Sequence, residues 1–66
     1  MNISSIIVQT NPEYLENIVA TLKTATFCEY HLHDELGRII VTIEAEGVEQ
    51  ELEDLKQIEQ IKGVMA

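Results

Sequence analysis

The chain is poor in cationic and cross-linking residues. Four Lys and Arg stand against twelve Asp and Glu, which gives a net charge of −8 at pH 7. A surface of this sign repels nucleic acids and anionic membranes and favours a cationic partner. The single cysteine excludes a disulfide within the chain and is typical of a reducing compartment. We therefore expect binding to neither nucleic acid nor membrane.

Long apolar segments are missing as well. No stretch approaches the roughly 20 apolar residues of a membrane span, and the opening MNISSIIVQT lacks the basic region of a secretion signal. The sequence therefore predicts a cytoplasmic protein. With 3 Gly, 1 Pro and 45% hydrophobic residues, the chain is expected to fold. Its length predicts a single domain, residues 1–66, with two layers around one core.

The apolar pattern predicts alternating strands and helices. β-Branched residues favour strands at 3–9, 27–33 and 37–46. Helices are expected at about 11–25, after the N-cap Asn11, and at about 48–61. Residues 64–66 can begin a fourth strand. This order predicts an α+β ferredoxin-like split βαβ (βαββαβ) sandwich, whose antiparallel sheet carries two helices on one face and whose fourth strand is truncated.

Such a fold leaves one sheet face open. Side chains alternate along a strand, so each strand presents one set to the helices and one to solvent. The sets expected to meet the helices are Ser4, Ile6 and Val8; Cys28, Tyr30 and Leu32; Ile39, Val41 and Ile43. The open face is expected to carry Ser5, Ile7, Glu29, His31, His33, Ile40, Thr42 and Glu44. This face has a small apolar centre with acidic and imidazole edges.

The second helix has an apolar and a charged side. We expect Leu52, Leu55 and Ile58 to face the core. Its carboxylates are expected to form a solvated face: Glu49, Glu51, Glu53, Asp54 and Glu59.

No catalytic or metal-binding constellation is predicted. Cys28, His31 and His33 are residue types that bind metals, but a regular strand points Cys28 away from both histidines, and a fourth ligand is not evident. Cys28 is expected to act as a small buried hydrophobe. The sequence has no Gly-rich phosphate loop and no Ser/His/Asp set. We expect no enzyme activity, no metal and no cofactor.

Three segments give the chain a family resemblance. SSIIVQTNPEYL, CEYHLHDELGRIIVTIEAE and IEQIKGVMA follow one another over nearly all 66 residues, and together they resemble the NapD family. The resemblance implies a ferredoxin-like fold and a cytoplasmic maturation chaperone of periplasmic nitrate reductase. It implies binding of the twin-arginine signal peptide of the catalytic subunit, which holds back export until the molybdenum cofactor is inserted. The chaperone itself is expected to bind neither metal nor cofactor.

The open face complements such a peptide, which is basic at its start and apolar after it. Glu29 and Glu44 are expected to take the guanidinium groups, and Ile7 and Ile40 the apolar segment. The predicted peptide-binding residues are Ser5, Ile7, Glu29, His31, Ile40, Thr42 and Glu44. The alternative is a self-assembling or small-ligand-binding regulatory module of the same fold.

The end of the sequence departs from the family pattern. Family members usually continue into a full fourth strand, whereas only Val64, Met65 and Ala66 follow Gly63 here. Most of the outer edge of the first strand is then expected to be unpaired, and such an edge is a template for another chain. The sequence therefore predicts a possible homodimer through this edge, with two-fold antiparallel pairing.

Overall fold

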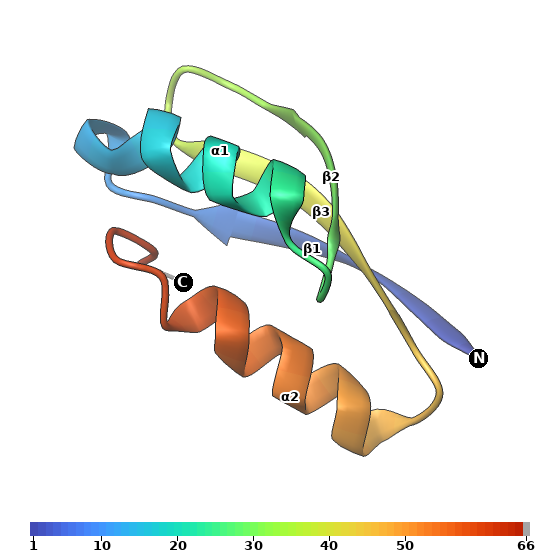
Figure 1. Ribbon diagram of the computed structural model, residues 1–66. Coiled ribbons are helices and arrows are strands. Elements are labelled where there is room, and N and C mark those ends of the chain that lie inside the picture. Colours follow the sequence, from blue (N-terminus) through green and yellow to red (C-terminus); the bar gives the residue numbers. More distant parts are fainter. Residues whose placement is uncertain (66) are drawn as a thin grey trace.

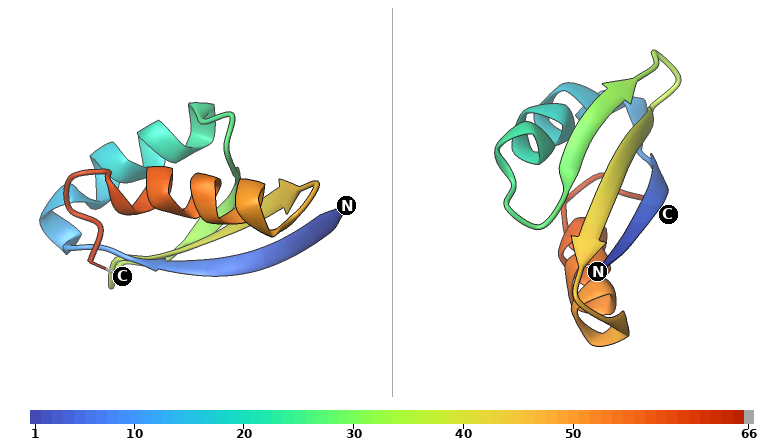
Figure 2. Two further views of the ribbon diagram at one scale, coloured as in Figure 1. Left: turned by 90° about the horizontal axis from the view of Figure 1, so that it is seen from below. Right: turned by 90° about the vertical axis from the view of Figure 1, so that its right-hand side faces the viewer.

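The computed structural model describes residues 1–65 and has an α+β fold (Figure 1). Its elements are β1 (Asn2–Gln9), the short 3₁₀ helix η1 (Pro12–Tyr14), α1 (Leu15–Thr24), β2 (Glu29–His33), β3 (Arg38–Ala45) and α2 (Val48–Glu59). The strands form an antiparallel sheet in the order β1-β3-β2. Both helices lie on one face of this sheet (Figure 2). The predicted α+β class and the order of these elements are confirmed.

The chain turns from β1 into α1 at a capped start. The side chain of Asn11 accepts a hydrogen bond from the Glu13 N–H at 3.1 Å, and Pro12 occupies the first helical position. Within α1 the residues Ile18, Val19 and Leu22 are buried. These three apolar side chains lie on one side of the helix and face the sheet.

The core lies between the helices and β3. Ile39, Val41 and Ile43 of this central strand are fully buried, and Val8 and Ile58 reach them from β1 and α2. The alternation along β3 is as predicted, because its even-numbered side chains point to the other face. A 66-residue chain can supply only one such helical layer.

α2 is rotated relative to the prediction. Asp54 is 6% exposed, whereas Leu52, expected in the core, is 52% exposed. Two side-chain hydrogen bonds accompany this rotation: the hydroxyl of Ser4 donates to Glu51, and Gln50 donates to the Asp54 carboxylate at 2.9 Å. The expectations for Leu52 and Asp54 were therefore wrong. The helix turns part of its acidic side inward, where Glu51 accepts the hydrogen bond from Ser4 of β1. Ile58 is buried as predicted.

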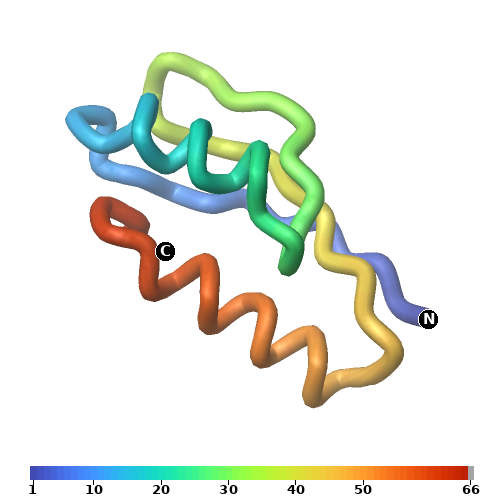
Figure 3. Tube along the Cα trace, viewed as in Figure 1, coloured from blue at the N-terminus to red at the C-terminus, as the bar shows by residue number. Residues whose placement is uncertain are grey.

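The C-terminal segment returns to the end of β1 (Figure 3). Val64 forms an antiparallel bridge with Thr10, and the Met65 N–H donates to the Gln9 carbonyl at 2.7 Å. The Asn11 N–H donates to the Gly63 carbonyl at 2.8 Å. Within residues 1–65 this pairing is an isolated bridge and not a fourth strand. Ala66, included in the expected strand, lies outside the described residues.

Adjacent residues of β3 provide a matched stability test. Val41→Asp would place an unpaired charge at a fully buried position, and we expect it to cost about 3–5 kcal/mol, comparable to the stability of a small domain. Ile40→Asp changes the opposite, half-buried face and is expected to cost about 1 kcal/mol. Urea unfolding followed by circular dichroism measures both. Equal losses for the two variants would contradict the assignment of the faces.

Cys28 and Asp54 provide a test of the α2 rotation. Burial, and to a smaller extent the Asp54 carboxylate, raises the pKa of the Cys28 thiol. A pKa raised by folding contributes stability below the pKa of the unfolded chain, and this contribution is lost as pH rises through the folded pKa. We expect slow alkylation of Cys28 near neutral pH, and faster alkylation in Asp54→Asn, because a smaller rise in pKa leaves more thiolate. The alkylation rate of Cys28 in the unfolded protein, measured in urea, is the reference. An unchanged rate in Asp54→Asn would contradict the position of Asp54.

Candidate functional site

The sheet face opposite the helices brings the predicted residues together. The register of β1 and β3 places Ser5 opposite Thr42 and Ile7 opposite Ile40. From β2, Glu29 lies opposite the same Thr42. Because residues paired across a sheet share a face, these side chains form successive rows. All seven predicted residues lie on this face or at its β2 edge: Ser5, Ile7, Glu29, His31, Ile40, Thr42 and Glu44.

A β-bulge in β2 changes the face of the residues after Tyr30. The pairing with β3 shifts by one residue between Tyr30 and Leu32, so Leu32 lies opposite Ile40 and His33 opposite Ile39. His31, at the bulge, hydrogen-bonds through Nε2 to the Thr42 hydroxyl at 2.9 Å. Leu32 is therefore on the open face, where its side chain is 58% exposed.

The bulge overturns two expectations. Leu32 was expected to face the helices and His33 to lie on the open face, and both were wrong because one extra residue inverts the alternation that follows it. On the helix side, His33 Nδ1 and the Tyr30 hydroxyl form a hydrogen bond at 2.5 Å. Lys23 of α1 lies 5.3 Å from the centre of the same Tyr30 ring.

The apolar centre of the face is a row across all three strands. Ile7, Ile40 and Leu32 stand side by side, and Ile7 is 63% exposed. Together with Asp34 and Arg38 they line a shallow hollow of about 180 Å³. The sequence predicted Ile7 and Ile40 on this face but not Leu32, because the residues of β2, EYHLH, give no signal of a bulge.

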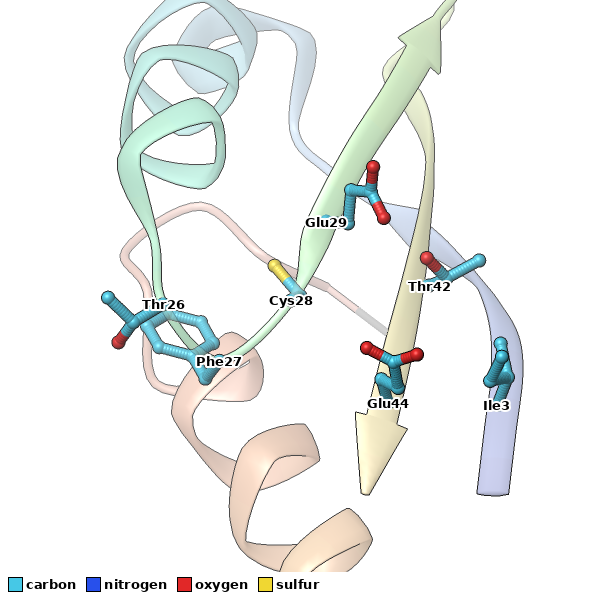
Figure 4. A pocket seen from close by; sticks show the side chains of 7 residues that line it. All are labelled: Ile3, Thr26, Phe27, Cys28, Glu29, Thr42 and Glu44. Atoms are coloured by element: carbon cyan, nitrogen blue, oxygen red, sulfur yellow. The ribbon is translucent and has the colours of Figure 1, made fainter. Parts of the chain in front are cut away.

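The other end of the face is acidic. Glu29 of β2 and Glu44 of β3 line a second hollow of about 270 Å³, shown in Figure 4, together with Ile3, Thr26, Phe27, Cys28 and Thr42. Both carboxylates belong to exposed residues, and within residues 1–65 neither forms an ion pair. Ile3 lies opposite Glu44, and its 66% exposed side chain adds apolar surface beside the acids. Ile3 was not among the predicted residues, although the period of β1 includes it.

This arrangement suits the binding of a basic and apolar ligand. Two unpaired carboxylates can accept guanidinium groups, and the exposed apolar row can cover an apolar segment. Among residues 1–65 no cluster of three or more His, Cys, Asp and Glu side chains is placed to hold a metal ion. The bulge also separates His31 from His33, which the regular strand would have kept on one side. In the same part of the chain, no helix is long and apolar enough to cross a membrane.

Comparisons with known proteins agree on one family. The sequence model of the NapD family, whose description is NapD protein, matches residues 1–66. The solution structure of the E. coli Tat proofreading chaperone protein NapD superposes with a TM-score of 0.89 at 29% identity, covering 98% of this chain and 70% of that one. No curated protein sequence matches significantly. Because the family match extends over the whole sequence, the chain belongs to the NapD family.

Proposed function

We propose that the protein is a cytoplasmic maturation chaperone that binds the twin-arginine signal peptide of the catalytic subunit of periplasmic nitrate reductase. By covering the peptide it holds back export until the molybdenum cofactor is inserted. One observation carries this proposal: in a chain of the NapD family, the open sheet face has at one end two carboxylates without an ion-pair partner among residues 1–65, and an exposed apolar row beside them.

The acidic end supplies recognition of the arginine pair. Glu29 and Glu44 project from neighbouring strands: Glu29 lies in the same row as Thr42, and Glu44 lies in the next row along β3. A guanidinium group matches a carboxylate with two parallel hydrogen bonds, whereas a lysine ammonium offers a single point of charge. Since both acids are exposed, each contact is worth only about 1 kcal/mol. Recognition therefore needs both acids and depends on salt.

The apolar row supplies most of the affinity. Ile7 and Leu32 keep more than half of their surface in water, and the half-buried Ile40 lies between them. Covering each of the two exposed side chains yields roughly 1–2 kcal/mol. The hydroxyls of Ser5 and Thr42 lie in the row of Glu29, next to the apolar row, and the ring of His31 is hydrogen-bonded to Thr42. These polar groups can hydrogen-bond the peptide backbone.

We also propose that the segment 63–65 is the start of a fourth strand, which would complete the βαββαβ order. Its hydrogen bonds to Gln9 and Asn11 support an antiparallel approach to the outer edge of β1. Along the rest of that edge, β1 has no strand partner within residues 1–65. The two-fold homodimer through this edge remains a prediction.

Peptide titration tests the recognition of arginine. We expect a leader peptide with Arg-Arg to bind more tightly than its Lys-Lys version, and rising salt to weaken it, because exposed charges are screened beyond about 8 Å at physiological ionic strength. Glu29→Gln and Glu44→Gln should each weaken binding about five-fold. Glu53→Gln, an equal charge change on the exposed side of α2, is the matched control. Equal affinity for both peptides, or an equal effect of Glu53→Gln, would overturn the arginine site.

The same titration tests the apolar row. Ile40→Asp should abolish peptide binding while the protein stays folded.

Sedimentation equilibrium tests the predicted homodimer. Residues 63–65 already occupy the Gln9–Asn11 end of this edge, so that a second copy can pair only with the rest of β1. We therefore expect weak association, visible only at high protein concentration. Ser5→Pro, which removes a backbone N–H from β1, should abolish it, whereas Ser5→Ala should not. A strictly monomeric chain at high concentration would contradict the prediction.

A further inference from the structure

The two ends of the open face differ in charge. At the end distant from Glu29 and Glu44, the Asp34 carboxylate accepts hydrogen bonds from the N–H groups of Leu36 and Arg38 at 2.9 and 3.1 Å. Its second oxygen lies 2.7 Å from both Nε and Nη2 of Arg38. The backbone hydrogen bond from Arg38 is the main cause that lowers the pKa of Asp34. This carboxylate is therefore already engaged, and it holds the Arg38 guanidinium beside the apolar hollow.

The turn that holds this pair is rigidly specified. Gly37 has a φ of 94°, and its carbonyl accepts hydrogen bonds from both the backbone N–H and the hydroxyl of Thr10, at 2.8 and 2.9 Å. A Cβ atom at Gly37 would lie 2.6 Å from the Thr10 carbonyl oxygen. Only glycine fits this position comfortably. Arg38, the next residue, therefore has a fixed place at the start of β3.

The distances along β3 separate the acids from this cation. Glu44 and Ile40 are four residues apart, which corresponds to about 13 Å along a strand, and Arg38 lies about 7 Å further. The intervening 13 Å is spanned by about four residues of extended peptide or about nine residues of helix. A peptide that is basic at its start and apolar afterwards can thus lie along the face and contact both ends.

We propose that this charge polarity fixes the direction of the bound signal peptide, with Arg38 as the residue that excludes the reverse. The arginine pair lies at Glu29 and Glu44, and the apolar segment runs over Ile7, Ile40 and Leu32 towards the turn. The peptide therefore runs parallel to β1 and β2 and antiparallel to β3. This inference rests on the proposed function, because it describes how that same face holds its ligand.

The reverse direction has two physical costs. It would bring the arginine pair of the peptide against the Asp34–Arg38 ion pair, where Arg38 already occupies the carboxylate that a guanidinium group would need. It would also lay apolar side chains over Glu29 and Glu44 and remove water from carboxylates that have no partner within residues 1–65. These two costs of the reverse arrangement add specificity that attraction to the right arrangement does not provide alone.

Spin-labelled peptides test the direction. A nitroxide placed just before the arginine pair should broaden the amide signals of Ile3, Glu29 and Glu44 several-fold more than those around the turn. A nitroxide after the apolar segment should have the opposite effect and broaden Leu36, Gly37 and Arg38 most. The measurement uses ¹⁵N-labelled full chain, with the reduced, diamagnetic label as reference.

A variant with two acidic ends tests the role of Arg38. Arg38→Glu combined with Asp34→Asn places an unpaired carboxylate beside the apolar hollow without setting two like charges against each other. We expect either label to broaden both ends in this variant, because both directions become favourable. Arg38→Lys is the matched control, which keeps the positive charge and should keep one direction. Dispersed amide spectra verify that each variant is folded.

The outcomes separate the direction from the function. A reversed pattern in the wild type, or equal broadening of both ends, overturns the inference and leaves binding on this face intact. One direction retained in Arg38→Glu/Asp34→Asn overturns the role of Arg38. No binding of the unlabelled peptide overturns the proposed function and this inference together.

Discussion

The alternation of side chains along β3 is the constraint on which both faces of the molecule depend. This strand lies between β1 and β2 and pairs with both. Its odd-numbered residues Ile39, Val41 and Ile43 fill the core, and its even-numbered residues form the middle of the open face. A slip of one residue in its pairing would exchange the two sets. The apolar core therefore fixes the position of the acids and of the apolar row.

Most of this arrangement follows from regular periodicity and could be predicted from the sequence. β1 and β3 have unbroken alternation, and the register places their residues on the predicted faces. The two errors have local physical causes. The bulge at His31 inserts one residue into β2, so the period fails for Leu32 and His33. No glycine or proline in that strand signals the change.

The helix error has a different cause. The apolar residues of α2 follow a helical period that places Leu52 inward, but Asp54 occupies a buried position. The hydrogen bonds from Ser4 to Glu51 and from Gln50 to Asp54 join residues that no pattern of hydrophobicity relates. Periodicity predicts that a helix has an inner side, whereas the contact between Ser4 and Glu51 favours a rotation that the apolar period does not predict. The candidate site escapes this error because no α2 residue contributes to the open face.

An exposed sheet face is suited to binding a ligand reversibly. Glu29 and Glu44 remain in water, so that each ion pair contributes little. The apolar row covers a segment without enclosing it, and part of the energy gained is offset by the loss of motion of the bound peptide. Affinity on such a face is the sum of small terms along the sheet. Because each term is small, the contacts can be broken one after another from one end of the face, and this favours reversible binding over permanent capture.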